Sequence, residues 1–249
     1  AGIKRDDEVI ISSHTMIATA SAITANGAKA IPVDCASDHL IDPQSIENAI
    51  TSKTKCIMPT QLNGRTANMD EILNVAKKYG LKIIEDSAQA LGSKFKEKNA
   101  GTFGLGGCIS FYPAKVLGCL GDGGIILCKD KIIYDKLIMM RDHGRDPLSG
   151  DVLLWGRNSR LDNIQAAILS FKLKTYTKVI DRRRDVANIY QERLGSLNEL
   201  QLPVAPVTDG DNFDRYEKEL SYFGDAGIEI DKFNKNLVLE AWQRQLEKQ

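Results

Sequence analysis

Short strand-like runs alternate with helix-like segments over residues 8–92, and this alternation constrains the fold more than any other feature. The strand-like runs, rich in Val, Ile and other apolar residues, occupy residues 8–11, 29–33, 55–59 and 81–86. The helix-like segments between them lie at about residues 14–26, 42–51 and 70–78. Strands separated by helices of this length form βαβ units. The sequence therefore predicts an α/β domain with a mostly parallel central sheet and helices on both faces.

The ends of two of these helices are marked by capping residues. Asp42 precedes Pro43, the arrangement of an N-cap followed by proline at the first helical position. Gly80 follows the segment 70–78 and suits the left-handed residue that ends many helices. These signals predict that one helix begins at residue 43 and that another ends just before residue 80.

A lysine stands between an apolar run and a turn rich in glycine. Residues 110–115 read Ser-Phe-Tyr-Pro-Ala-Lys, residues 116–124 contain four glycines, and another strand-like run follows at 125–128. A lysine held on a tight loop between buried strands loses hydration, and desolvation makes its amine nucleophilic. The alternative is a loop lysine whose ammonium group extends to water. On this stretch alone, both interpretations of Lys115 are open.

The strand-like run at residues 81–86 ends in a carboxylate, Asp86, and Gln89 follows three residues later. In open α/β sheets, ligands bind beyond the carboxyl ends of the strands. A strand-end aspartate with a loop lysine about thirty residues later matches a pyridoxal phosphate site, where the lysine forms a Schiff base and the aspartate pairs with the pyridinium nitrogen. The alternative for Asp86 is a helix N-cap, a role that Ser87 could also take.

The composition argues against several classes of partner. Lysine plus arginine equals aspartate plus glutamate, at 33 each, so no net field favours nucleic acid or an acidic membrane surface. No run approaches the ~18 apolar residues of a transmembrane helix. Residues 1–8 are charged and polar, unlike a signal peptide. We therefore expect no nucleic-acid partner and no membrane.

The cysteines indicate a reducing compartment. Five are present, an odd number without a CxxC pair, at positions 35, 56, 108, 119 and 128. Most lie among strand-like residues, which predicts reduced, buried thiols in a cytoplasmic protein. Only His39 lies near a cysteine, without a second Cys or His pair, so no metal site is expected.

Five motifs occur in one order along residues 1–200. They read HTMIATA at 14–20, QLNGR at 61–65, DSAQ at 86–89, SFYPAK followed by GDGG within 110–124, and GRNSRLD at 156–162. In this order they resemble the DegT/DnrJ/EryC1/StrS family of nucleotide-sugar aminotransferases. The resemblance implies the large domain of fold type I, similar to aspartate aminotransferase, with pyridoxal 5'-phosphate as cofactor. It implies an enzyme that moves an amino group from glutamate to a keto group of a nucleotide-linked deoxysugar, in amino-sugar biosynthesis for a surface polysaccharide or a glycosylated metabolite.

The resemblance also implies roles for single residues. Catalysis would rest on Lys115 and Asp86. The further cofactor ligands that it implies are Gln89, Ser110, Asn158 and Met16. The substrate-binding residues that it implies are Tyr112, His14 and Arg160.

Several of these residues have an ordinary structural interpretation as well. Met16 stands where the family usually has an aromatic residue stacked on the pyridine ring, but it could be a core residue. His14 could be a cap or a satisfied polar group. Ser110, implied at the cofactor phosphate, could be an ordinary strand-end serine. Asn158, implied to reach the cofactor phosphate of a partner subunit, could form a local Asx turn.

Family members are longer at both ends, which sets the expected domain organisation. We expect a PLP-binding large domain at residues 1–178, without its N-terminal segment and phosphate-binding loop. A connecting helix and a partial C-terminal domain would follow at residues 179–249, with a linker near 202–211. The implied role of Asn158 predicts a homodimer with shared active sites.

Two other functions stay open. The chain could be a non-catalytic remnant or structural relative that folds without turnover. It could also be a PLP-dependent sugar dehydrase of the same family, but that branch has histidine in place of the lysine, so Lys115 argues against it. The sugar, the carbon atom and the nucleotide are not predicted by the sequence.

Overall fold

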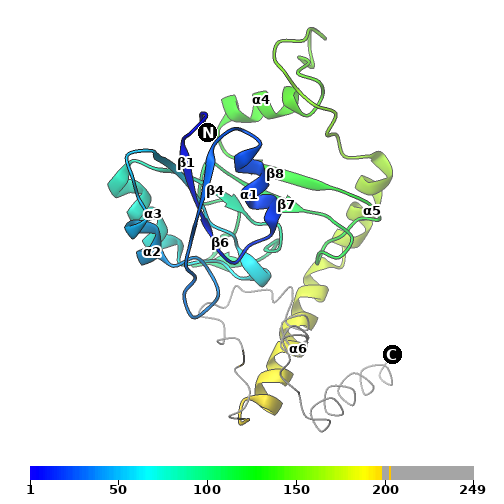
Figure 1. The fold of residues 1–249 in the computed structure, drawn as a ribbon. Helices are drawn as coiled ribbons and strands as arrows, with labels where there is room; N and C mark the ends of the chain where they lie inside the picture. Colours follow the sequence, from blue (N-terminus) through cyan, green and yellow to red (C-terminus); the bar gives the residue numbers. More distant parts are fainter. Residues whose placement is uncertain (198–201, 203–249) are drawn as a thin grey trace. The chain divides into compact units, whose positions relative to one another are not determined.

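The computed structural model describes residues 1–197 and 202, so most of the expected C-terminal part and its linker lie outside the described residues. A six-stranded sheet in the order β2-β1-β3-β4-β7-β8 forms the centre of this part (Figure 1). Its strands are β1 (Glu8–Ser12), β2 (Lys29–Val33), β3 (Thr54–Met58), β4 (Lys82–Asp86), β7 (Gly106–Ser110) and β8 (Gly124–Cys128). All neighbouring strands run parallel except β8, which is antiparallel to β7. The predicted α/β class with a mostly parallel sheet is confirmed.

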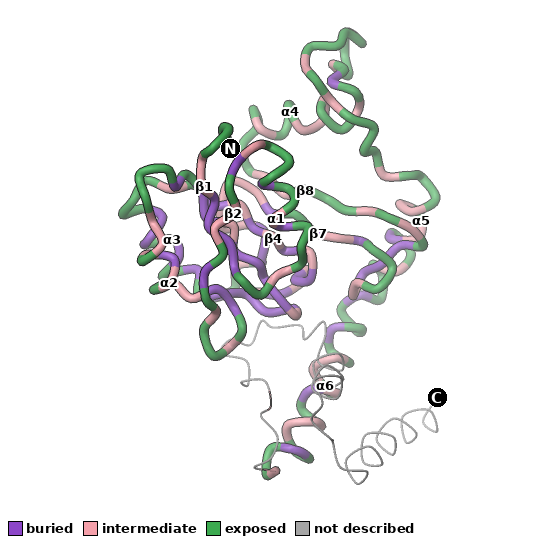
Figure 2. The backbone as a smooth tube through the Cα atoms, viewed as in Figure 1, coloured by how far each residue is buried: buried purple, intermediate pink, exposed green. Residues whose placement is uncertain are grey.

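Helices cover both faces of this sheet, and β1 and β3 are its most buried strands (Figure 2). The connecting helices are α1 (Ile17–Thr24), α2 (Pro43–Asn48) and α3 (Met69–Tyr79). Successive side chains of a strand point to opposite faces. In β1, Val9 packs in one core cluster with Ile23 of α1, whereas Ile10 packs in another with Ile46 of α2 and Ile72 of α3. α1 therefore covers one face, and α2 and α3 cover the other.

The helix ends lie where the capping residues indicate. The carboxylate of Asp42 accepts hydrogen bonds from the backbone N–H groups of Gln44 at 3.3 Å and Ser45 at 3.0 Å, with Pro43 at the first helical position. Gly80 ends α3 in the left-handed conformation, with φ of 65°. A left-handed residue costs glycine little, which explains its use at this end.

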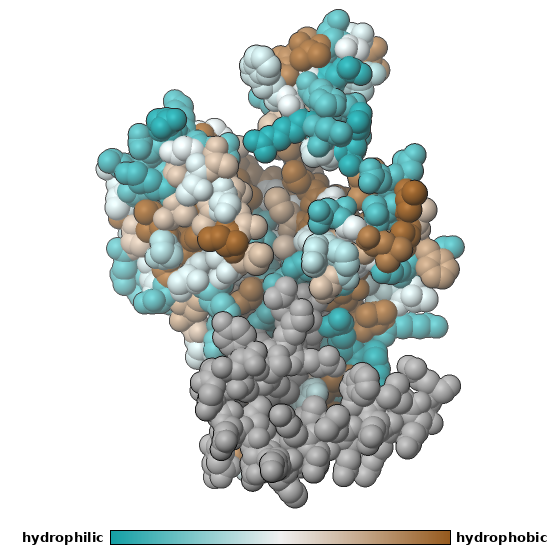
Figure 3. All heavy atoms as spheres, turned by 45° about the vertical axis from the view of Figure 1, so that its right-hand side comes forward, coloured by the Kyte–Doolittle hydropathy of each residue, from teal (hydrophilic) through white to brown (hydrophobic). Residues whose placement is uncertain are grey.

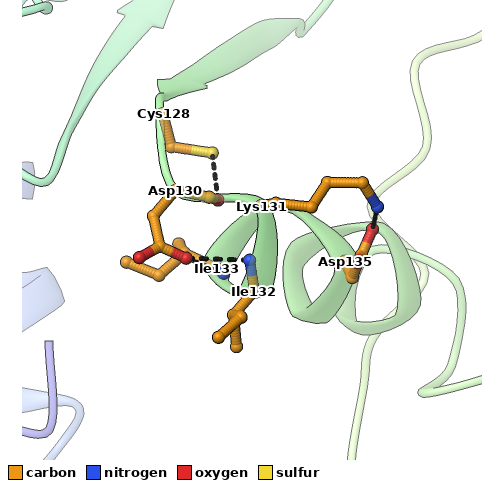
Figure 4. Close-up of polar contacts among 6 residues, drawn as sticks. All are labelled: Cys128, Asp130, Lys131, Ile132, Ile133 and Asp135. Atoms are coloured by element: carbon orange, nitrogen blue, oxygen red, sulfur yellow. Dashed lines mark hydrogen bonds and ion pairs between the residues drawn. The ribbon is translucent and has the colours of Figure 1, made fainter.

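The helix α4 (Lys131–Met140) follows β8 and begins at a second aspartate cap. The carboxylate of Asp130 accepts from the backbone N–H groups of Ile132 at 2.8 Å and Ile133 at 3.0 Å (Figure 4). Lys131 and Asp135, one turn apart, form an ion pair on the surface. No residue of α4 is fully buried in the described part of the chain.

Two further helices pack behind β7. They are α5 (Asn163–Leu173) and α6 (Tyr176–Leu194), where the sequence predicts one or two long helices. Leu169 of α5 and Ile180 of α6 form a core cluster with Ile109 and Phe111. The hydroxyl of Tyr176 donates to the carbonyl oxygen of Leu91 at 2.6 Å. These contacts support the strand that leads into the Lys115 loop.

The segment between β4 and β7 contains a small hairpin that the sequence does not predict. Its strands, β5 (Lys94–Phe95) and β6 (Lys98–Asn99), have two residues each and pair antiparallel. The turn between them places Lys96 and Glu97 at positive φ, 46° and 62°. The hairpin connects β4 to the loop that precedes β7.

All five cysteines are free, but they are not uniformly buried. Cys56 and Cys119 are buried, and burial raises the pKa of the Cys56 thiol to about 11. Cys35 and Cys128 are half-buried, and Cys108 is exposed. The expectation of a buried thiol was wrong for Cys108, because its side of β7 and β8 is open: Ile126, opposite it in β8, is also 51% exposed.

Candidate functional site

The carboxyl ends of four strands meet at one edge of the sheet, because β1, β3, β4 and β7 run parallel. Three of these strands end at Ser12, Asp86 and Ser110, and β8 begins at the same edge with Gly124, opposite Ser110. The connection from β1 to β2 passes over one face of the sheet through α1, and the connection from β3 to β4 passes over the other face through α3. The strand order therefore reverses between β1 and β3. Such a reversal opens a crevice beyond the strand ends, where α/β proteins bind ligands.

Asp86 is held at this edge by a set of hydroxyl groups. Its Oδ2 accepts from the Thr19 hydroxyl at 2.5 Å, and its Oδ1 accepts from the backbone N–H of Ala88 at 3.1 Å. The Thr15 hydroxyl lies 2.8 Å from that of Thr19 and 2.7 Å from that of Thr60. The segment after Asp86 is a turn followed by β5, not a helix, which excludes the helix-cap interpretation.

The preceding residue, Glu85, points to the other face and is completely buried. One of its oxygens accepts from the side-chain amide of Gln61 at 3.0 Å and the N–H of Gly101 at 2.7 Å. The other accepts from the N–H groups of Phe103 at 2.6 Å and Gly104 at 3.2 Å. Four donors compensate the burial of this carboxylate. It therefore fixes the turn that leads into β7.

Gln89 and Ser110 both lie next to the strand ends. Gln89 is buried, and its side-chain oxygen accepts from the backbone N–H of Asn63 at 2.8 Å. The hydroxyl of Ser110 accepts from the N–H of Tyr112 at 3.2 Å, which starts the turn out of β7. The side chain of Tyr112 is 54% exposed. The structure thus places these two predicted cofactor ligands on neighbouring strand exits.

Lys115 is half-buried on the loop that joins β7 to β8. The loop closes on itself, because the backbone N–H and the thiol of Cys119 both donate to the carbonyl oxygen of Phe111, at 2.8 and 2.9 Å. A side chain at Gly118 would place its Cβ 2.4 Å from the carbonyl oxygen of Pro113, so only glycine fits there. The glycine-rich sequence therefore encodes a tight, fastened loop around the lysine.

His14 and Met16 lie on the segment between β1 and α1, beside the Thr15 hydroxyl. Met16 is 62% exposed at the N-cap position of α1, which excludes the core interpretation. The His14 ring meets that of His39 edge-to-face, with centroids 6.0 Å apart. Burial and then the nearby charge of His39 lower the pKa of His14.

Asn158 and Arg160 lie on a different segment, residues 141–160, which folds back on itself. Asn158 pairs antiparallel with Asp142, and Arg145 with Val152. The guanidinium of Arg160 forms an ion pair with the carboxylate of Asp142 at 2.8 Å. The structure groups these two predicted site residues with their own segment and not with the strand edge.

Sequence reasoning missed the residues that support Asp86. Thr15 and Thr19 are four residues apart at the start of a helix, a spacing that predicts a shared face. Glu85 stands next to Asp86 in a strand, so the two carboxylates had to point to opposite faces. Nothing local marks Thr60. Among the described residues, no cluster of His, Cys, Asp or Glu is arranged to hold a metal ion, and none of the helices has the length and apolar character needed to cross a membrane.

Comparison with known proteins agrees with this arrangement. The model of the DegT/DnrJ/EryC1/StrS aminotransferase family matches residues 1–222. The chain is 41% identical over 211 residues to dTDP-3-amino-3,4,6-trideoxy-alpha-D-glucose transaminase of Streptomyces venezuelae, covering 84% of this chain and 55% of that protein. It is 43% identical over 203 residues to UDP-N-acetyl-3-dehydro-alpha-D-glucosamine 3-aminotransferase of Acidithiobacillus ferrooxidans, covering 81% and 54%. The chain thus spans about half the length of these relatives.

A solved structure shows the same fold. DesV of S. venezuelae, crystallised in complex with a ketimine intermediate, superposes with a TM-score of 0.82 at 38% sequence identity, covering 90% of this chain and 62% of that one. The order of motifs, the sheet and the family match point to one conclusion. The chain belongs to the DegT/DnrJ/EryC1/StrS aminotransferase family.

Proposed function

We propose that this chain binds pyridoxal 5'-phosphate and acts in an aminotransferase that moves an amino group from glutamate to a keto group of a nucleotide-linked deoxysugar. The observation that carries the proposal is the strand edge, where an anchored carboxylate and a fastened lysine loop follow neighbouring strands. The names of the two relatives, a dTDP-sugar transaminase and a UDP-sugar aminotransferase, support the substrate class. We also expect the protein to act in the cytoplasm.

The side chains at this edge fit the chemical groups of the cofactor. Asp86 offers an oriented carboxylate to a protonated ring nitrogen, and Lys115 offers an amine to an aldehyde carbon. Ser110 offers a hydroxyl for the phosphate, and Gln89 adds an amide. When bound, pyridoxal phosphate supplies an electron sink for the carbon that loses its proton. The donor set at the edge therefore supports pyridoxal phosphate as the cofactor.

The mechanism assigns separate tasks to the chain's own residues. Lys115 would hold the cofactor through its aldehyde carbon and, with its amine free, would move the proton that the substrate carbon loses. Asp86 would hold a proton at the ring nitrogen. Met16, exposed at the N-cap position of α1, would contact the cofactor ring through its sulfur atom. Tyr112, with His14 and Arg160, would bind the substrate.

A second copy of the chain would complete the site. Asn158 lies on the segment 141–160, away from the strand edge, and this segment exposes Leu148 and Trp155 almost fully, each at 97%. Hydrophobic side chains are also visible at several places on the face in Figure 3. We propose a two-fold homodimer in which Asn158 and Arg160 reach the partner's site. The proposed boundary between the PLP-binding domain (1–178) and the connecting helix with its partial C-terminal domain (179–249) falls in the first turn of α6.

The test is a half-reaction in the absence of a sugar. Loaded with pyridoxal phosphate, the chain should show a visible absorption band that falls when glutamate is added, with formation of one 2-oxoglutarate per site. A band that glutamate leaves unchanged would instead identify a non-catalytic relative. A dehydrase is disfavoured by the lysine at position 115, and product analysis with a keto-sugar nucleotide separates amination from loss of water.

A further inference from the structure

Three threonine hydroxyls form a continuous chain behind Asp86. The hydroxyl oxygens of Thr60 and Thr15 are 2.7 Å apart, those of Thr15 and Thr19 are 2.8 Å apart, and Thr19 lies 2.5 Å from the carboxylate. Thr19 and Thr60 are buried, at 3% and 5% exposure, and Thr15 is half-buried. Thr60 follows β3, Thr15 lies in the segment after β1, and Thr19 belongs to α1. Three elements therefore converge on one carboxylate.

The direction of this chain follows from counting protons. An ionised carboxylate only accepts hydrogen bonds, and each hydroxyl donates one proton. Thr19 must use its proton on Asp86, so Thr15 donates to Thr19 and Thr60 donates to Thr15. All three hydroxyl protons then point toward Asp86. Hydrogen bonds in such a series polarise one another, so the last donor is stronger than an isolated hydroxyl.

The chain also restricts the rotation of the carboxylate. Thr19 holds Oδ2 from the α1 side, while the N–H of Ala88 holds Oδ1 at 3.1 Å. The strand end itself is tied to Thr60, which pairs with Asp86 in a parallel bridge. With both oxygens held, the plane of the carboxylate is fixed before any ligand binds.

We propose that Thr19, Thr15 and Thr60 are positioning residues that hold Asp86 in the orientation in which it pairs with the cofactor's ring nitrogen. This inference rests on the proposed function. It predicts that the hydroxyl groups, and not the bulk of the threonines, are needed for tight cofactor binding.

The first test replaces single hydroxyl groups. Thr19→Val keeps the shape of the side chain and removes the donor, while Thr19→Ser keeps the donor. Thr24→Val is the matched control, because Thr24 is an exposed residue of the same helix outside the chain of hydroxyls. The dissociation constant of pyridoxal phosphate, from absorbance titration, should rise ~10-fold or more in Thr19→Val. It should stay near the wild-type value in the other two, and thermal unfolding checks that each variant folds.

A second test asks whether the hydroxyls act as one unit. Thr15→Val leaves Thr19 in place but removes its polarising donor, so the cofactor affinity should fall by less than in Thr19→Val. In the Thr19→Val background, adding Thr15→Val should change the affinity no further. Independent, additive losses would contradict a connected chain, even if both single variants bind the cofactor weakly.

A measurement without cofactor separates this inference from the proposed function. In the cofactor-free protein, the ¹³C carboxyl resonance of Asp86, assigned with Asp86→Asn, should move in Thr19→Val and, less, in Thr15→Val, but not in Thr24→Val. If the wild-type chain binds pyridoxal phosphate and Thr19→Val binds it equally well, the inference is overturned and the proposed function stands. If the wild-type chain takes up no cofactor, the proposed function fails and the positioning role falls with it, whatever the resonance shows.

Discussion

Two adjacent carboxylates in β4 have different environments because neighbouring strand residues face opposite sides. Glu85 is enclosed by backbone and amide donors, whereas Asp86 faces α1 and the open strand edge. The strand-end position and the later lysine loop marked Asp86 and Lys115 as candidate site residues in the sequence. The hydroxyls of Thr19 and Thr60 were not, because they are far apart in the chain and threonine is common in ordinary cores.

At this scale, replacing Asp86 tests its proposed pairing with the ring nitrogen. Asp86→Asn should slow the glutamate half-reaction by about 100-fold or more, because a neutral pyridine ring is a weaker electron sink. Stopped-flow absorbance measures the rate. Asp130→Asn, the same change at the cap of α4, should leave the rate unaltered. A near-normal rate in Asp86→Ala would remove Asp86 from the catalytic residues.

The neighbouring side chains of His14 and His39 allow a test of local electrostatics. His39→Asn removes the second cause of the lowered pKa of His14, and asparagine tolerates the positive φ of 63° at that position. The pKa of His14, followed by NMR, should therefore rise but not fully recover, because burial is the larger cause. In the wild type, His14 of the unfolded chain has the ordinary pKa of about 6.5, whereas His14 of the folded protein has a lower pKa. As the pH falls below about 6.5, the unfolded chain binds this proton before the folded protein does, so the free energy of unfolding decreases on acidification. An unchanged titration would show that the two rings do not interact.

At the scale of elements, local signals predicted the helices and most strands, as the caps Asp42 and Gly80 illustrate. The hairpin of β5 and β6 was not predicted, because strands of two residues are too short to show an alternating pattern. The antiparallel direction of β8 depends on pairing with β7, which no local pattern specifies. The buried role of Glu85 likewise depends on a turn sixteen and more residues away.

Glu85 provides a stability test of that turn. Glu85→Ala should lower the free energy of unfolding by ~3 kcal/mol or more, because it leaves the amide of Gln61 and three backbone N–H groups, one buried and two half-buried, without their acceptor. Denaturant unfolding measures the change. Glu97→Ala, at a side chain that is 88% exposed, should cost little by comparison. Equal effects of the two substitutions would mean that the Glu85 network does not stabilise the fold.

At the scale of the whole molecule, the order of the motifs along the sequence predicted the family, and the family match confirms it. The sequence did not predict which surfaces stay open. Ile126 of β8, Phe171 of α5 and Trp155 are exposed at 51%, 74% and 97%. Exposed apolar residues of this kind are typical of surfaces that contact another chain. Whether another chain covers them depends on geometry that local patterns do not contain.

Subunit complementation tests the shared site. Lys115→Ala and Asn158→Ala should each be inactive alone, whereas subunits exchanged between the two preparations should recover part of the activity. In a mixed dimer, one site keeps its own Lys115 and receives Asn158 from the partner. Exchange that is demonstrated by mass but restores no activity, or a monomer by light scattering, would refute the shared site.

The most direct test of the central claim asks which lysine holds the cofactor. The chain is incubated with pyridoxal phosphate and reduced with borohydride, which fixes the cofactor to the lysine that binds its aldehyde carbon, and the peptides are mapped by mass spectrometry. Lys172, which contacts the carbonyl of Gly118 in the same loop, provides the neighbouring comparison. The account predicts one label per chain, on Lys115, and no label in Lys115→Ala. A label on Lys172 or any other lysine, or no label in the wild type, would contradict it.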